Sequence, residues 1–214
     1  MRDPENIKDV SELGVDLIGF IFHPKSPRFV KMLSSEAGIP PDYVSDDISK
    51  TVKKPKRVGV FVDEMPQSII TRVVNFGLDY IQLHGHETRE TCENLRATID
   101  SVIKPGIRII KAISVATAED ILKYKEYVGA VDLFLFDTKT KLAGGSGQQF
   151  DWSVLEQYDG DTPFLLSGGI GLEDAERIKE FHPKCVGIDL NSKFEIEPGL
   201  KDVSKLKEFL EKIK

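Results

Sequence analysis

The sequence predicts an α/β fold in which helices cover a parallel sheet. Short apolar runs rich in β-branched and aromatic residues alternate with amphipathic segments at a spacing of about 20–30 residues, which is typical of consecutive βα units. Each run is almost continuously apolar, as expected for strands that are buried on both faces. The predicted strands are residues 15–22, 57–62, 80–83, 108–113, 133–137, 163–167 and 185–190.

The amphipathic segments between these runs predict the helices that connect successive strands. Asp3, Pro4 and Glu5 form a helix start, with Asp as the cap and Pro at the first helical position, so the chain is expected to open on a helix at residues 4–13. Thr117, which two acidic residues follow closely, is a second start signal. The other predicted helices are residues 66–76, 88–99, 118–127, 172–181 and 203–213, a shorter one at 151–157, and one at 34–54 that glycine and prolines interrupt.

The number of strands bears on the choice between two α/β architectures. No strand precedes the first helix, which leaves seven predicted strands for eight helical segments. A closed (βα)8 barrel needs eight strands and would lack its first strand here. An open doubly wound sheet tolerates seven, but it places a glycine-rich phosphate turn after its first strand, and none follows Phe22. No linker or shift in composition divides the chain, so residues 1–214 are expected to form a single domain.

The composition excludes several classes of protein. With a formal net charge of -6 and a pI near 5.3, the chain lacks the clustered positive charge that attracts nucleic acids or anionic membranes. Cys92 and Cys185 belong to no C-x-x-C pair, which argues against structural zinc and a disulfide framework. The apolar runs are only as long as strands, and no secretory signal is recognisable. We therefore expect a cytoplasmic monomer or homodimer that binds neither nucleic acid nor membrane.

Polar residues follow the predicted strands, and in α/β barrels the active site lies at this end of the strands. Asp137 ends an apolar run, where a carboxylate is costly to bury unless it is paired or catalytic. Lys111, inside another predicted strand, is either half of a buried ion pair or a substrate contact. Gln82, His84 and His86 alternate along a third run, but they have no carboxylate or thiolate partner there, and we predict no metal site.

Two consecutive loops are candidates for binding phosphate. Gly168 and Gly169 follow the sixth predicted strand, where two adjacent glycines allow a backbone to approach an anion closely. The alternative is that the two glycines only form a tight turn before a helix. Asp189, Asn191 and Ser192 follow the next strand, and paired loops at this place in a barrel often bind phosphate on backbone N–H groups.

A glycine-rich loop and an arginine complete the set of candidates. Gly144, Gly145, Ser146 and Gly147 suit either a lid that closes over substrate or a plain connector. Arg28 follows a Ser-Pro turn and offers a guanidinium fork that matches a carboxylate. A surface salt bridge is the alternative for this arginine.

Six segments together carry a resemblance to a known family. They read GFIFHPKSPRFV (19–30), VGVFVDE (58–64), IQLHG (81–85), LFDTKT with GGSGQQFDW (135–152), LLSGGI (165–170) and GIDLNSKFE (187–195). Over essentially its whole length, the chain is similar to the phosphoribosylanthranilate isomerases of tryptophan biosynthesis. The resemblance implies a (βα)8 TIM barrel that needs no cofactor. It also implies an Amadori rearrangement of N-(5-phosphoribosyl)anthranilate to 1-(2-carboxyphenylamino)-1-deoxy-D-ribulose 5-phosphate.

The resemblance also implies roles for individual residues. Asp137 matches the general acid that protonates the furanose ring oxygen, and Arg28 matches the arginine that holds the anthranilate carboxylate. Gln82 and His84 are expected to contact the substrate, as is the mobile loop formed by Gly144, Gly145, Ser146 and Gly147. The residues that match the phosphate loops are Gly168, Gly169, Asp189, Asn191 and Ser192.

The chain departs from the family pattern at two places. The family's general base is the cysteine of a Cys-Gly pair that ends the first strand, just before the Met-Arg-Asp stretch with which this sequence starts. Neither Cys92 nor Cys185 matches that position, so the chain as written is expected to be inactive or impaired. In addition, Lys193 stands in the phosphate loop where many relatives have glycine; it either adds a charge contact or points into solvent.

Two alternatives stay open at this stage. The first is a barrel that binds a phosphorylated ligand without converting it. The second is another phosphate-binding barrel enzyme, such as indole-glycerol-phosphate synthase, whose chemistry needs additional lysines and a glutamate at the strand ends. Only Lys111 stands at a comparable place in this sequence.

Overall fold

The centre of the structure is a curled parallel sheet. The computed structural model describes residues 1–31, 54–138, 151–179 and 181–214. Within these ranges seven parallel strands form one sheet, in which each strand pairs with the next one along the chain. The strands are β1 (Leu17–Ile21), β2 (Lys56–Phe61), β3 (Tyr80–Leu83), β4 (Arg108–Val115), β5 (Leu133–Thr138), β6 (Phe164–Leu166) and β7 (Cys185–Ile188). All seven predicted strands are therefore confirmed, and β1 and β7 are the end strands of the sheet.

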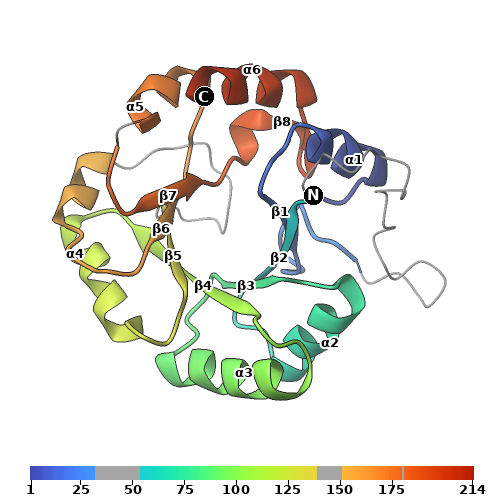
Figure 1. Ribbon diagram of the computed structural model, residues 1–214, viewed down its shortest axis with the longest axis vertical. Coiled ribbons are helices and arrows are strands. Elements are labelled where there is room, and N and C mark those ends of the chain that lie inside the picture. Colours follow the sequence, from blue (N-terminus) through green and yellow to red (C-terminus); the bar gives the residue numbers. More distant parts are fainter. Residues whose placement is uncertain (32–53, 139–150, 180) are drawn as a thin grey trace.

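Helices surround the outer side of the curled sheet, which gives the molecule the form of an α/β half-barrel (Figure 1). The α-helices are α1 (Pro4–Glu12), α2 (Pro66–Phe76), α3 (Arg89–Val102), α4 (Ala118–Ile121), α5 (Ala175–Lys179) and α6 (Val203–Ile213). The short 3-10 helices are η1 (Leu122–Tyr127), η2 (Trp152–Gln157), η3 (Leu172–Asp174) and η4 (Ser192–Phe194). In the described part of the chain, no helix is long and apolar enough to cross a membrane.

The helix starts follow the predicted capping signals. The side chain of Asp3 accepts a hydrogen bond from the N–H of Asn6 at 2.8 Å, with Pro4 at the first helical position of α1. Thr117 and Asp120 form a capping box at the start of α4. The predicted helix 118–127 continues after α4 as the 3-10 helix η1, so only its first turn is α-helical. The predicted broken helix at 34–54 lies almost entirely outside the described residues.

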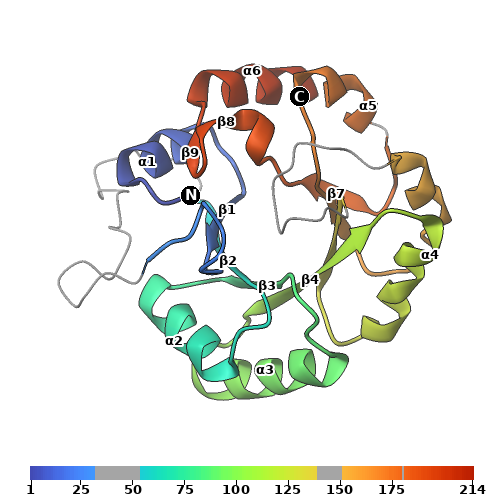
Figure 2. The ribbon, with the colours of Figure 1, turned by 180° about the vertical axis from the view of Figure 1, so that it is seen from behind.

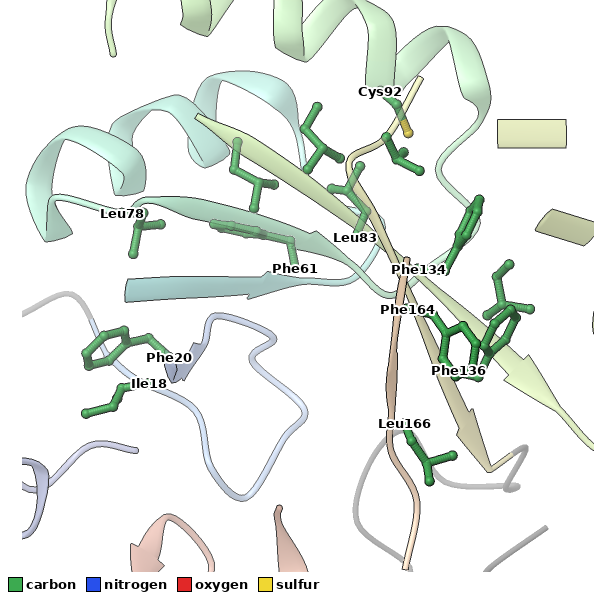
Figure 3. Packing of buried hydrophobic residues seen from close by; sticks show 14 of the residues in the cluster. Ile18, Phe20, Phe61, Leu78, Leu83, Cys92, Phe134, Phe136, Phe164 and Leu166 are labelled. Carbon is green, nitrogen blue, oxygen red and sulfur yellow. The ribbon is translucent and has the colours of Figure 1, made fainter. Parts of the chain in front are cut away.

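The core has two layers because side chains alternate between the two faces of the sheet. The larger layer packs between the sheet and the helices, and Figure 3 shows part of it, including Phe61, Phe134 and Phe164. The smaller layer fills the inside of the curl. Its members are Val58, Ile110, Ala112, Leu133, Leu135 and Leu165. This apolar filling below the strand ends makes the barrel interior a packed core rather than a channel.

A short hairpin after β7 was not among the predicted elements. Its strands, β8 (Glu195–Glu197) and β9 (Leu200–Lys201), are antiparallel. The side chain of Asn6 in α1 donates to the carbonyl oxygen of Lys201 at 2.8 Å and accepts from the N–H of Lys201 at 2.7 Å. These two hydrogen bonds join the hairpin to the first helix, and the views in Figures 1 and 2 place both beside the N-terminus.

Candidate active site

The carboxyl ends of the parallel strands lie at one end of the sheet, and Asp137 is the central polar residue there. His84 directly follows β3, and its Nε2 lies 3.4 Å from Oδ2 of Asp137 in β5. On the other side of the ring, Nδ1 lies 3.4 Å from Nε2 of Gln82. An amide nitrogen can only donate, so Nδ1 accepts and a neutral His84 carries its proton on Nε2, toward the carboxylate. The structure thus brings together three of the predicted residues.

Gly168 approaches Asp137 from the loop after β6. Its φ is +93°, and a Cβ atom built on it would lie 2.2 Å from Oγ1 of Thr138 and 2.9 Å from Oδ1 of Asp137. The N–H of Thr138 donates to the same Oδ1 at 2.9 Å. A residue with a side chain would therefore be strained at position 168 and would displace the end of β5. The glycine is needed for the contact with the predicted acid as well as for the shape of its own loop.

The loop after β7 supplies the second group of predicted phosphate-site residues. Oγ of Ser167 donates to Oδ2 of Asp189 at 3.1 Å. Burial raises the pKa of Asp189 and the neighbouring Asp137 adds to the rise, although Lys201 acts in the opposite direction. Asn191 precedes η4, which begins at Ser192.

Arg28 forms a buried ion pair and not the surface salt bridge considered from the sequence. Its Nη2 lies 2.6 Å from Oε2 of Glu195, and the two side chains are 7% and 4% exposed. Lys201 Nζ lies 3.3 Å from Oε1 of the same glutamate. Burial acts to raise the pKa of Glu195, but Arg28 and Lys201 outweigh it and hold that pKa below the usual value. Burial lowers the pKa of Lys201.

Lys111 is the other buried cation, and it lies on the helix-facing side of the sheet. Its Nζ is 2.8 Å from Oε2 of Glu87, and both side chains are only 3% exposed. Nζ also donates to the carbonyl oxygen of Gly85 at 2.7 Å and lies 5.5 Å from the centre of the Tyr127 ring. Of the two predictions for Lys111, the structure has the buried ion pair.

Neither cysteine is placed to act as a base. Cys92 is buried in α3 on the helix side of the sheet, and burial raises the pKa of its thiol to about 11. Cys185 is the first residue of β7, away from the carboxyl end of that strand, and burial raises its pKa too. A thiol with a raised pKa carries little thiolate at neutral pH. The cysteines are therefore packing residues.

His86 and Lys193, two other residues singled out from the sequence, form ion pairs with carboxylates. His86 is exposed and pairs with Asp63, its Nδ1 being 3.0 Å from Oδ2. Lys193 pairs with Glu173 at 2.7 Å on the surface, and its side chain is 31% exposed. The predicted loop of Gly144, Gly145, Ser146 and Gly147 lies outside the described residues. Among the residues that the structure does describe, no group of three His, Cys, Asp or Glu side chains is arranged to hold a metal ion.

Comparison with known proteins identifies the family to which this arrangement belongs. A family model described as N-(5'phosphoribosyl)anthranilate (PRA) isomerase matches residues 1–212. The chain belongs to this family. A PRA isomerase of Parabacteroides distasonis is 49% identical over 214 residues, which are all of this chain and 90% of that protein. The chain is thus a member of an enzyme family of tryptophan biosynthesis, as the sequence motifs indicate.

Solved structures of PRA isomerases share the fold. The enzyme from Thermotoga maritima is 31% identical and superposes with a TM-score of 0.78, over 100% of this chain and 95% of that one. A PRA isomerase in complex with reduced 1-(o-carboxyphenylamino)-1-deoxyribulose 5-phosphate is 28% identical, with a TM-score of 0.75 over 100% and 94% of the two chains. These similarities confirm the predicted α/β barrel architecture.

Three residues of the strand-end region were missed by the sequence reasoning. Glu195 closes the last of the six family-like segments but carries no signal of its own there. Lys201 lies beyond all six, and its role depends on a hairpin that was not predicted. Thr138 follows the predicted acid directly, and its buried Oγ1 has no hydrogen-bond partner among the described residues. The only feature of the sequence that could have pointed to Thr138 was its position next to Asp137.

Proposed function

We propose that the chain rearranges N-(5-phosphoribosyl)anthranilate to 1-(2-carboxyphenylamino)-1-deoxy-D-ribulose 5-phosphate, with Asp137 as the general acid. The observation that carries this proposal is the placement of Asp137 at the end of β5. Its carboxylate lies between His84, the N–H of Thr138 and the close backbone of Gly168. A carboxyl group held from several sides at the strand ends of a barrel has the position that proton transfer to a bound substrate needs.

The acid acts at the first chemical step. Protonation of the furanose ring oxygen by Asp137 breaks the bond from that oxygen to C1′, and the lone pair of the anthranilate nitrogen forms the C=N bond of an iminium ion. Loss of the C2′ proton then gives an enolamine, which becomes the ketose. A positioned acid accelerates such a step by about 10²–10⁴-fold.

The two anionic ends of the substrate need separate anchors. In this proposal Arg28 binds the anthranilate carboxylate, with Gln82 and His84 contacting the substrate between the anchors. The loops that follow β6 and β7 bind the phosphate through Gly168, Gly169, Asn191 and Ser192, with Asp189 beside them. Anchors on two sides hold the ribose across the strand ends near the acid, which lowers the entropic cost of reaching the reactive geometry. The ligand of the solved PRA isomerase complex has both a carboxyphenyl group and a phosphate.

The mechanism also needs a general base, and neither Cys92 nor Cys185 is placed to be that base. Cys92 is buried in α3 and Cys185 begins β7, away from the carboxyl end of that strand. The family resemblance implies a cysteine as the base, and we propose that a cysteine removes the C2′ proton.

A side-by-side assay tests the base and the family activity together. Consumption of N-(5-phosphoribosyl)anthranilate is followed by anthranilate fluorescence with the chain as written and with a version extended upstream by a strand ending in Cys-Gly. Turnover that depends on the added Cys-Gly would support a cysteine as the base. Equal turnover by both would mean that another residue is the base. If both fold and neither turns over, the isomerase proposal is wrong and a non-catalytic phosphate-ligand binder takes its place.

The indole-glycerol-phosphate synthase alternative loses its one supporting residue. Lys111, which it needs at the strand ends, is on the helix side of β4 and paired with Glu87. A cytoplasmic location and a monomeric or homodimeric state remain predictions. Cell fractionation and analytical ultracentrifugation would check them.

A further inference from the structure

A continuous cluster of buried charge extends from Arg28 to the loop after β7. Arg28 follows β1 in the chain, Glu195 begins β8 and Lys201 ends β9. The glutamate is therefore shared by two cations that come from distant parts of the sequence. Two buried cations thus contact one buried carboxylate at the place where anionic substrate groups are proposed to bind.

Two of the three guanidinium nitrogens of Arg28, Nε and Nη2, donate to Glu195. Nε lies 2.9 Å from each carboxylate oxygen of Glu195, and Nη2 donates to Oε2 at 2.6 Å. The third nitrogen, Nη1, has no hydrogen-bond acceptor among the residues that the structure describes. Since a guanidinium carries N–H donors on all three nitrogens, Nη1 stays available for a ligand carboxylate.

Glu195 is fixed from its other side as well. Its Oε1 accepts a hydrogen bond from the N–H of Gly199 at 3.1 Å and one from Lys201 Nζ at 3.3 Å. Nζ of Lys201 also donates to the carbonyl oxygen of Leu190 at 2.9 Å and to Oδ1 of Asn191 at 3.1 Å. Leu190 and Asn191 belong to the loop that is proposed to bind the phosphate. The lysine therefore links the glutamate to that loop.

We propose that Glu195 is a positioning residue that fixes Arg28 for the carboxylate of the substrate and, through Lys201, fixes the phosphate loop relative to Arg28. The inference rests on the proposed function, in which Arg28 binds the anthranilate carboxylate. An arginine side chain that moves freely before binding loses conformational entropy about several rotatable bonds when it binds a ligand. Glu195 orders Arg28 in the free protein, so this loss does not weaken substrate binding.

The geometric part of the proposal is tested by Glu195→Asp, which keeps the charge and withdraws the carboxylate by one methylene. Two ligands are titrated calorimetrically into the chain: reduced 1-(o-carboxyphenylamino)-1-deoxyribulose 5-phosphate, and the phenylamino analogue that lacks only its carboxylate. We expect the variant to bind the carboxylated ligand about tenfold more weakly, which corresponds to one weakened charge-assisted hydrogen bond. Its affinity for the analogue should change by less than about twofold.

The matched control is Glu197→Asp. Glu197 is on the same strand, but it is exposed and lies 3.9 Å from an exposed Arg2. Its replacement should leave both affinities unchanged. Equal losses for the two ligands in Glu195→Asp would show a merely structural role for Glu195, and no loss would show that the arginine orders itself; either result overturns the proposal.

Thermal melting checks that each variant is folded. If Glu195→Asp does not fold, Glu195→Gln makes the same comparison, since it keeps the shape and one acceptor oxygen. The same ligand-selective loss is expected for it, and an equal loss or a gain in affinity contradicts the proposal. Failure of the unaltered chain to bind either ligand would instead overturn the proposed function, and this inference with it.

Discussion

Lys111 and Arg28 are both cations buried against a glutamate, but their surroundings differ. Lys111 and Glu87 form a pair of one cation and one anion, and the second oxygen of Glu87 accepts the N–H of Asp63 at 2.9 Å. The pair lies between the sheet and the helices. At the strand ends, by contrast, Arg28 and Lys201 share the single carboxylate of Glu195, and Arg28 keeps unoccupied donors in the described structure.

On the proposed function, the difference separates a role in the fold from a role in binding. A balanced pair whose polar atoms are all occupied has nothing left for a ligand, and breaking it leaves a buried charge uncompensated. On the proposed function, the free donors of Arg28 bind an anionic group of the ligand. Variants of the two regions should therefore affect different measurements.

The largest effect should come from Asp137→Asn at the strand ends. In a form of the chain that turns over, we expect the rate to fall by about 10²–10⁴-fold, because the amide cannot supply the proton. Steady-state kinetics measures the fall, and urea unfolding should give nearly the same stability as for the unaltered protein. A rate that stays the same would remove Asp137 from the mechanism, while a large loss of stability would place it with Lys111 as a residue of the fold.

Next in size is Lys111→Met, which leaves the carboxylate of Glu87 buried without its cation. Removal of one partner of a buried pair typically costs about 3–5 kcal/mol of folding free energy. Urea or thermal unfolding would measure it. The folded fraction should retain the ligand affinity of the unaltered chain. A selective loss of affinity with little change in stability would show that Lys111 is part of the binding region after all.

Arg28→Met should lower ligand affinity and should change the folding stability less than Lys111→Met does. Glu195 still has Lys201 as a partner, so no buried carboxylate is left without a cation. We expect the affinity for the carboxylated ligand to fall by about 10- to 100-fold, the range of one or two charge-assisted hydrogen bonds. Calorimetric titration measures the affinity, and thermal melting measures the stability. An unchanged affinity would contradict the assignment of Arg28 to the carboxylate.

The smallest expected effect is on the pH dependence of folding stability, through Asp189. Burial, with Asp137 adding to it, raises the pKa of Asp189 in the folded protein above the unfolded value of 3.8. Its contribution to stability is therefore fully present below pH 3.8 and is lost as pH rises through the folded pKa. Asp189→Asn should be more stable than the unaltered chain at pH 7, and this advantage should disappear near pH 3. Urea unfolding at both pH values tests this, and a destabilised variant at pH 7 would show that the ionised carboxylate stabilises the fold.

Much of the fold was predictable because it depends on local patterns. Apolar runs located all seven strands, and Asp3 with Pro4 located the start of α1. The helix pattern at 118–127 did not reveal that only one turn is α-helical, since a 3-10 turn keeps nearly the same polar and apolar order. The hairpin of β8 and β9 was missed because strands of three and two residues are too short for alternation to show.

The site was predictable only in part, for a different reason. Asp137, His84 and Gly168 meet because parallel strands end on one side of the sheet, which is a property of the architecture. The pairing of Arg28 with Glu195 joins residues 167 positions apart, and no periodicity or spacing in the sequence encodes it. Whether Lys111 faced inward or outward also depended on the exact register of β4.

The contact between Gly168 and the end of β5 has a consequence for attempts to redesign the enzyme. A single methyl group at position 168 would collide with both Asp137 and Thr138, so the proposed phosphate loop is in direct contact with the proposed acid. Enlarging or recharging that loop to accept a different sugar phosphate would shift the acid at the same time. Directed evolution toward new substrates is therefore expected to leave this glycine untouched and to collect its changes around Arg28.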